Sequence, residues 1–116
     1  MTDAVFRLPA AERPAAAAVF NDYAAVDLMY RLRDFGLAVP GDVAIAGFAN
    51  IIPALPSGVG LTTIAQPYEE IGRAAVDLLL RRRKTPSAPV ATVELPARSV
   101  VRESSAGPAA PHVPAA

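Results

Sequence analysis

Residues 15–48 read AAAAVFNDYAAVDLMYRLRDFGLAVPGDVAIAGF, and this stretch decides the fold. An apolar run over 15–20 precedes an amphipathic segment whose apolar side chains recur at three- and four-residue steps, the spacing of one helix face. A turn at Pro40-Gly41 then leads to a second apolar run over 43–48. The order strand, helix, strand predicts a βαβ unit with parallel strands, and therefore an α/β fold. Because the first run is continuously apolar, we expect helices to bury that strand on both faces.

The helix of this unit has clear signals at both ends. Asn21 or Asp22 can cap its start, because a side-chain oxygen there accepts a hydrogen bond from a backbone N–H group two or three residues on. Gly36 stands where a left-handed residue commonly ends a helix. The apolar stripe that is expected to face the core consists of Ala25, Leu28, Met29, Leu32 and Phe35.

Candidate binding residues stand at the carboxyl end of both predicted strands, where open parallel α/β sheets bind their ligands. Asn21 and Asp22 follow the first strand, and an amide beside a carboxylate suits a polyol such as a sugar. Phe48 and Asn50 follow the second strand. Helix capping explains Asn21 and Asp22 equally well, and Asn50 also suits an ordinary turn.

Composition excludes several classes of function. The 116 residues suffice for one domain, and their formal net charge of zero provides no field that attracts DNA or an anionic membrane. The lack of cysteine excludes disulfides, and the single histidine, His112, argues against a metal site. No nucleophile–histidine set and no phosphate-binding glycine loop is recognisable, so we expect neither an enzyme nor a cofactor. Without a secretion signal or a membrane-spanning run, we expect a cytoplasmic protein.

The rest of the chain predicts shorter elements and a second helix. The helix is expected from Pro67 to Lys84, since proline suits a first turn and the basic run 81–84 suits the last turn. That run also resembles a nucleic-acid patch, but a solvated helix end explains it in a neutral chain. Residues 1–13 read as a connection. From Ser104 onward the alanine, proline and glycine composition offers nothing to pack, and 106–116 read as a disordered tail. Possible strands cover 3–8, 61–65, 91–95 and 98–102.

The second helix carries an apolar stripe along one face. Its polar face is rich in arginine and glutamate, as in a helix that is covered on one side only. An exposed apolar stripe predicts association with a partner. The stripe consists of Ile71, Ala75, Leu78 and Leu79.

Four motifs together resemble the lactose/galactose repressor (LacI/GalR) family of transcriptional regulators. Residues 13–22 resemble a strand of that family that ends in Asn-Asp. The segment GLAVPGDVAIAGF at 36–48 is similar to the family signature Gly-Leu-x-Val-Pro-x-Asp-Val-x-Val-x-Gly-Phe. LTTIAQP at 61–67 and VVRES at 100–104 resemble its later strands. Four motifs in this order are specific, and they extend from about Arg13 to Ser105.

The resemblance implies a fold and a function. Residues 14–105 are expected to form the carboxyl-terminal part of a type I periplasmic-binding-protein-like sensor, a parallel sheet of βαβ units flanked by helices. Such sensors are usually dimeric and bind a sugar or another small effector between two lobes. The implied effector contacts are Asn21, Asp22, Phe48 and Asn50. The implied dimer interface contains Tyr23, Val26, Asp27 and Tyr30.

The sequence also departs from the family pattern. Ala49-Asn50 stands where the family usually carries an acidic pair, and Asp27 replaces a small helix residue. The helix-turn-helix head and most of the amino-terminal lobe have no counterpart in these residues, so we expect a fragment that does not bind DNA directly. The resemblance implies that the helix from Pro67 to Lys84 packs on that lobe, so its apolar stripe has no evident place here. Two functions are then open: an effector-binding part of a sensor, or a remnant that dimerises with a full-length relative and modulates it.

Overall fold

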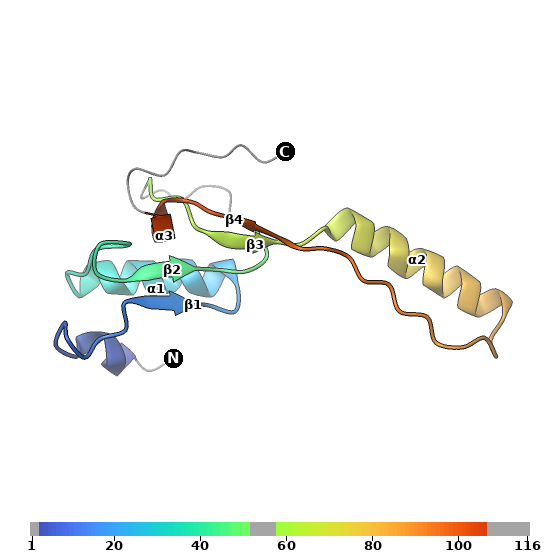
Figure 1. Ribbon diagram of the computed structural model, residues 1–116, viewed down its shortest axis with the longest axis horizontal. Helices are drawn as coiled ribbons and strands as arrows, with labels where there is room; N and C mark the ends of the chain where they lie inside the picture. The colour runs from blue at the N-terminus through green and yellow to red at the C-terminus, as the bar shows by residue number, and fades with distance from the viewer. Residues whose placement is uncertain (1–2, 52–57, 107–116) are drawn as a thin grey trace. The chain divides into compact units, whose positions relative to one another are not determined.

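The computed structural model describes residues 3–51 and 58–106. The chain divides into two compact units, one made of Met1–Ala65 with Ser99–Ala116 and the other of Gln66–Arg98. Each unit has its own local structure and is described by itself. Figure 1 labels the helices and strands in chain order.

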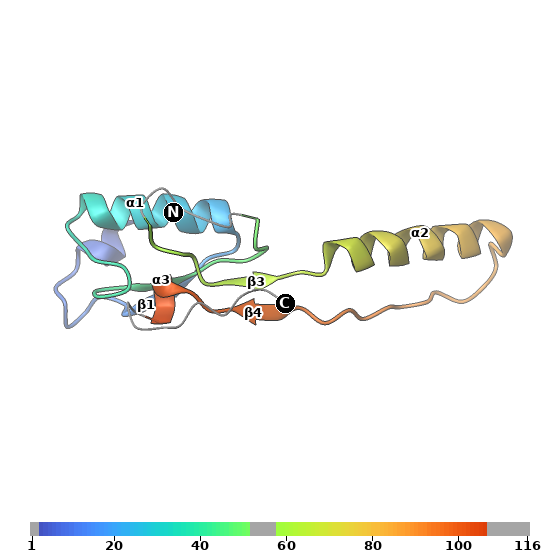
Figure 2. The ribbon, with the colours of Figure 1, turned by 90° about the horizontal axis from the view of Figure 1, so that it is seen from above.

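The first unit contains the predicted βαβ arrangement. Strands β1 (Ala16–Ala18) and β2 (Ala44–Ala46) pair in parallel, with Ala17 opposite Ile45. Helix α1 (Asp22–Asp34) connects them and lies along one face of the pair, as Figures 1 and 2 show from two directions. The parallel pairing and the crossover helix confirm the fold class that the sequence predicts.

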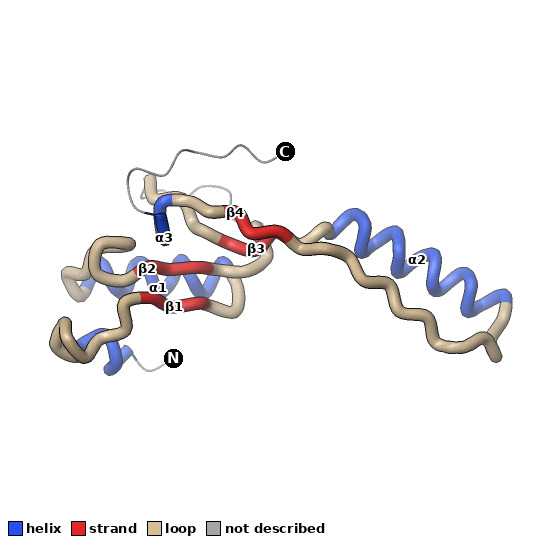
Figure 3. Tube along the Cα trace, in the orientation of Figure 1, coloured by secondary structure: helices blue, strands red, loops and turns tan. Residues whose placement is uncertain are grey.

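A second pair of strands continues from this unit. Strand β3 (Thr63–Ala65) pairs with β4 (Arg98–Val100), and both are drawn in red in Figure 3. Two isolated parallel bridges, Ala46 to Thr62 and Ala49 to Ala65, join the end of β2 to the β3 segment. The short helix α3 (Glu103–Ala106) follows β4. The carboxyl end of β2 is therefore flanked by β1 on one side and by β3 on the other.

The core of the first unit is built around α1. The predicted stripe faces inward, because four of its members are buried and Phe35 is half-buried. Gly36 adopts a φ of +76°, as expected for a left-handed residue after a helix. The buried core residues are Phe6, Val19, Ala25, Leu28, Met29, Leu32, Val43, Ile45 and Leu61.

Residues 3–8 do not form the strand that their sequence allows. Asp3–Arg7 form a 3-10 helix, η1, which buries Phe6 in the core. The Arg7 guanidinium carbon lies 4.7 Å from the centroid of the Phe35 ring, a cation–π contact. A helical turn is favoured here because Phe6 can then contact the core while its neighbour Arg7 contacts Phe35 at the end of α1. In a strand, the two side chains would point to opposite sides.

Strand β1 differs from the expectation that helices bury it on both faces. Ala17 is half-buried against the core, but Ala16 and Ala18 are exposed. The alternation follows from the strand geometry, because successive side chains point to opposite faces and α1 covers only one of them. The apolar run therefore marks small side chains rather than complete burial.

Two further expectations near the end of the chain are corrected. No strand forms over 91–95 in the described residues, and only Arg98–Val100 pair with β3. Ser104, in a stretch whose composition offers little to pack, is fully buried, since its hydroxyl donates to the Ile45 carbonyl at 2.7 Å and accepts from Thr62 N at 2.8 Å. Of the predicted tail, Ala106 ends α3 and residues 107–116 lie outside the described part of the chain.

The second unit consists of α2 (Tyr68–Lys84) and the segment that follows it. The predicted helix is confirmed, but none of its residues is buried. Arg82 closes the turn after the helix by donating to the carbonyls of Pro86 and Ala88, at 3.0 and 2.7 Å. The basic run thus serves partly as a C-terminal cap, which agrees with the interpretation of a solvated helix end.

Candidate functional site

Asn21 and Asp22 lie at the carboxyl end of β1, as the sequence predicts. Asn21 is the N-cap of α1, since its side-chain oxygen accepts from Ala24 N at 2.8 Å. The capping interpretation is therefore correct for Asn21. Its side chain is half-buried, so it still lies at the rim of this edge.

Asp22 has no exposed surface, and both of its carboxylate oxygens are engaged inside the chain. Oδ1 accepts from the Thr63 hydroxyl at 2.6 Å, and Oδ2 accepts from Ile51 N at 2.8 Å. Its own N–H group donates to the Phe48 carbonyl at 3.0 Å. A buried carboxylate persists only when donors satisfy it, and these three bonds tie the ends of β1, β2 and β3 together.

Thr63 extends this hydrogen-bond network from Asp22 to Asn50. Its hydroxyl donates to Asp22 and accepts from Asn50 N at 3.2 Å. A hydroxyl is suited to this place because it can donate and accept at the same time. From the sequence alone, Thr63 is expected only in a strand. The alternation in that strand, which places Thr63 on the same face as buried Leu61 and Ala65, was the signal for an internal polar contact.

The corner after β2 has an unusual backbone. Ala49 has a φ of 110° and Asn50 a φ of 55°. Asparagine tolerates the left-handed region, but alanine at this φ is strained and persists only where its surroundings hold it. Three successive backbone N–H groups of this corner donate hydrogen bonds. Ala49 N donates to the Ile64 carbonyl at 2.9 Å, Asn50 N donates to the Thr63 hydroxyl, and Ile51 N donates to the Asp22 carboxylate.

Arg102 is a site residue that the sequence analysis did not identify. Its Nη2 donates to the side-chain oxygen of Asn50 at 2.8 Å, and its Nη1 donates to the Leu61 carbonyl at 2.6 Å. Arg102 follows β4 at a separation of 52 residues from Asn50. No local pattern predicts such a contact, because pairing of the later strands brings the two residues together.

The segment before this corner requires a glycine at position 47. A Cβ atom there would lie 2.5 Å from Asp22 Oδ1 and 3.0 Å from a methyl group of Leu61. Both neighbours are fully buried and cannot move away without cost. The glycine thus lets β2 approach the Asp22 carboxylate closely.

Two exposed aromatic side chains flank this edge. Phe20 is 78% exposed and Phe48 is 38% exposed. Because Ala18 pairs with Ala46, each phenylalanine stands two residues beyond the last pair of the parallel strands. The structure therefore brings together Asn21, Phe48 and Asn50 at the surface of one edge, with Asp22 buried beneath them.

The predicted interface residues lie on α1. Tyr23 is 66% exposed, whereas Val26 and Tyr30 are half-buried. Asp27 is exposed and pairs with Arg31 at 2.8 Å, so its charge does not enter the core. The Arg33 guanidinium lies over the Tyr30 ring, 5.1 Å from the centroid.

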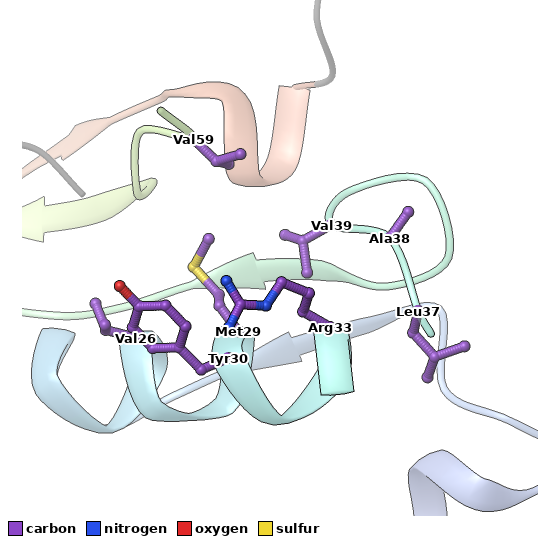
Figure 4. A pocket seen from close by; sticks show the side chains of 8 residues that line it. All are labelled: Val26, Met29, Tyr30, Arg33, Leu37, Ala38, Val39 and Val59. Atoms are coloured by element: carbon purple, nitrogen blue, oxygen red, sulfur yellow. The ribbon is translucent and has the colours of Figure 1, made fainter. Parts of the chain in front are cut away.

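An apolar hollow of about 270 Å³ opens beside these residues. Figure 4 shows side chains from α1, from the turn after it and from Val59 around the hollow. The lining residues are Val26, Met29, Tyr30, Arg33, Leu37, Ala38, Val39 and Val59. Two of the four predicted interface residues thus border a recess on one face of the first unit.

Within residues 3–51 and 58–106, no three His, Asp or Glu side chains gather in a way that could hold a metal ion. His112 lies outside that part of the chain. None of the described helices is long and apolar enough to cross a membrane.

Comparison with known proteins gives a consistent result. Residues 1–105 match the family described as periplasmic binding protein-like domain. The chain is 38% identical over 93 residues to the HTH-type transcriptional repressor PurR of Vibrio vulnificus, which covers 80% of this chain and 28% of that protein.

Solved structures agree with this match. A LacI-family transcriptional regulator from Enterococcus faecium with bound ribose is 34% identical, with a TM-score of 0.63 over 79% of this chain and 34% of that chain. The dimeric Lac repressor is 28% identical, with a TM-score of 0.66 over 78% of this chain and 33% of that chain. The chain thus spans about a third of the length of each of these structures.

Proposed function

The chain belongs to the LacI/GalR family of transcriptional regulators, through its periplasmic binding protein-like domain, and we propose that it is part of an effector-binding sensor. The observation that carries the proposal is the edge formed by Asn21, Phe48 and Asn50. These side chains reach the surface at the carboxyl ends of two parallel strands, where α/β sheets bind ligands.

The proposal gives the four residues different roles. Phe48 offers an apolar surface to a small effector, and Asn21 and Asn50 offer polar groups beside it. Asp22 acts from below, because its carboxylate holds the N–H group of Ile51 and the hydroxyl of Thr63. The effector is a sugar or a similar small molecule, a class that includes the ribose bound by the Enterococcus faecium relative.

Binding is tested by calorimetry and thermal shift with a panel of sugars that includes ribose. A ligand that binds the folded chain raises its melting temperature with concentration. Asp22→Ala is expected to abolish binding because the corner loses its anchor, and Asn50→Ala and Phe48→Ala are expected to weaken binding while the fold is kept. Asp34→Ala is the matched control, since its side chain is exposed at the end of α1, pairs with Arg33 and has no proposed role. Binding that survives all three site variants would overturn the assignment.

A second function concerns α1 and the hollow beside it. We propose that Tyr23, Val26, Asp27 and Tyr30 contribute to a dimer interface, either with a second copy or with a longer relative that the chain modulates. The exposed ring of Tyr23 and the apolar recess bordered by Val26 and Tyr30 support this role, since such surfaces are enriched at interfaces. The Lac repressor with similar structure is dimeric.

The interface is tested by sedimentation of the purified chain over a range of concentrations. Val26→Glu places a charge at the recess and is expected to dissociate the dimer. Val76→Glu is the matched control, since it makes the same exchange at an exposed position of α2. A monomer at all concentrations, which also fails to bind a full-length relative, would exclude the interface.

The same proposal places the chain among regulators rather than enzymes. The relative from Vibrio vulnificus is named as a transcriptional repressor. We propose that this chain has no catalytic activity and acts in the cytoplasm, where a bacterial regulator meets its effector.

A further inference from the structure

The orientation of the Asn50 side chain decides which hydrogen-bonding group it can offer. Arg102 has only donors, so the oxygen of the Asn50 amide must face the guanidinium. The amide nitrogen then lies on the opposite side of the planar group. In the described residues no acceptor is bonded to that nitrogen, and Asn50 is half-buried at the edge of the site. The amide nitrogen of Asn50 therefore has its N–H donors free for a ligand, whereas its oxygen already accepts from Arg102.

The side chains of this corner offer a ligand no free carboxylate. Ala49 has no polar side chain, and both carboxylate oxygens of Asp22 are engaged with Thr63 and Ile51. Asp22 is also fully buried, so a ligand at the surface cannot reach it. The hydroxyl groups of a neutral sugar would find a donor at this corner but no carboxylate to accept from them.

Arg102 adds a positive charge to the same place. Its guanidinium bonds to two neutral oxygens, from Asn50 and Leu61, and no carboxylate pairs with it among the described residues. Arg102 is only half-buried, so its charge acts on the solvent beside Asn50. A cation next to a fixed amide donor favours an anionic oxygen, because charge-assisted hydrogen bonds are the stronger ones.

We infer that the effector carries a carboxylate, as a sugar acid does, and that this group binds at the Asn50–Arg102 corner. The inference rests on the proposed function, since it concerns the ligand class of the same edge. Asn50 donates to the carboxylate directly, and Arg102 is a positioning residue that fixes the amide and supplies the positive field.

The test compares the two members of a ligand pair that differ only in the carboxylate group. Glucuronate and glucose share a pyranose ring, and galacturonate and galactose form a second pair; ribose and cellobiose complete the panel. Calorimetry on the 116-residue chain is expected to give at least tenfold tighter binding for an acid than for its neutral partner. Sodium acetate at the same concentration is expected to give no comparable shift in melting temperature.

Asn50→Asp is the diagnostic variant. It replaces the amide donor with a carboxylate that pairs with Arg102 and repels an acid, so the preference for the acid is expected to fall at least tenfold. The change is nearly isosteric, and an unchanged melting temperature without ligand shows that the fold is kept. Ser87→Asp, in the exposed turn after α2, is the control, since it adds the same single negative charge in the other unit.

Each outcome decides the question. Tighter binding of an acid that Asn50→Asp reverses supports the inference. Equal or tighter binding of the neutral sugars overturns it but leaves the proposed function in place. Binding of no member of the panel overturns both. An equal response to acetate means that Arg102 attracts any small anion, which also overturns the inference.

Discussion

The two main helices look alike in sequence and differ completely in packing. Helix α1 and helix α2 both carry apolar side chains on one face and charged side chains on the other. In α1 five residues are buried, whereas in α2 none is. Asn21 caps α1 with its side chain, but Pro67 gives α2 no side-chain cap.

The difference shows what a hydrophobic stripe does and does not predict. Its period predicts that a segment is helical and which face is apolar. It does not tell which part of a protein covers that face. Leu79 in α2 is 66% exposed, whereas Leu32 at a similar place in the α1 pattern has no exposed surface. Four experiments test how far this contrast extends.

The largest expected effect separates the two stripes directly. Leu32→Ala should lower the free energy of unfolding by about 2–5 kcal/mol, because it leaves a cavity in the core around α1. Leu79→Ala should change it little, since the side chain already meets solvent. Urea unfolding followed by circular dichroism measures both. A comparable loss for Leu79→Ala would mean that α2 is covered in solution and would break the contrast.

The buried carboxylate provides the second test. Asp22→Ala leaves two donors, Ile51 N and the Thr63 hydroxyl, without an acceptor, and should cost roughly 2–4 kcal/mol. Asp22→Asn keeps one acceptor oxygen and should cost about half as much. Asp77→Ala in α2 is the matched control and should leave the unfolding midpoint unchanged. If Asp22→Ala behaves like this control, the hydrogen-bonded corner does not stabilise the fold.

Two glycine substitutions should act with opposite signs. Gly47→Ala places a methyl group 2.5 Å from Asp22 Oδ1 and should destabilise the first unit by about 1–3 kcal/mol. Gly72→Ala in α2 meets nothing within 4 Å and should stabilise the helix by about 0.5–1 kcal/mol, since alanine is the better helix former. Thermal melts of the two variants give the signs. A loss of stability for Gly72→Ala would show that another surface contacts this face of α2.

The smallest effects are expected at the helix starts. Asn21→Ala removes the hydrogen bond to Ala24 N and should cost about 1 kcal/mol. Glu69→Ala removes an exposed ion pair with Arg73 and should change the melting temperature within error, because solvent screens such pairs. The comparison fails if the exposed pair proves as important as the cap.

Most of the local structure could be predicted from the sequence, because its causes are local. The stripe of α1, the left-handed Gly36 and the parallel strands around the helix were all expected and all form. The errors concern segments whose state depends on a distant contact. Residues 3–7 form the helical turn η1 instead of a strand because Phe6 is buried in the core. Ser104 is buried because it is hydrogen-bonded to Ile45 and Thr62.

The candidate site shows the same division. The sequence placed Asn21, Asp22, Phe48 and Asn50 at the ends of two strands, and the structure has them there. It did not reveal Thr63 or Arg102, which reach the corner from strands that are distant along the chain. Whether a polar residue faces solvent or a buried partner depends on strand pairing, which no short motif encodes.

The sequence by itself determined the family, the βαβ unit, the helix limits and the edge where a ligand is expected. These follow from periodicity, turn chemistry and ordered motifs, all of which act between near neighbours. Only the tertiary structure decided that Asp22 is buried and bonded on both oxygens and that Arg102 orients Asn50. These properties depend on long-range contacts, because burial and hydrogen-bond partners are set by the segments that fold against a residue.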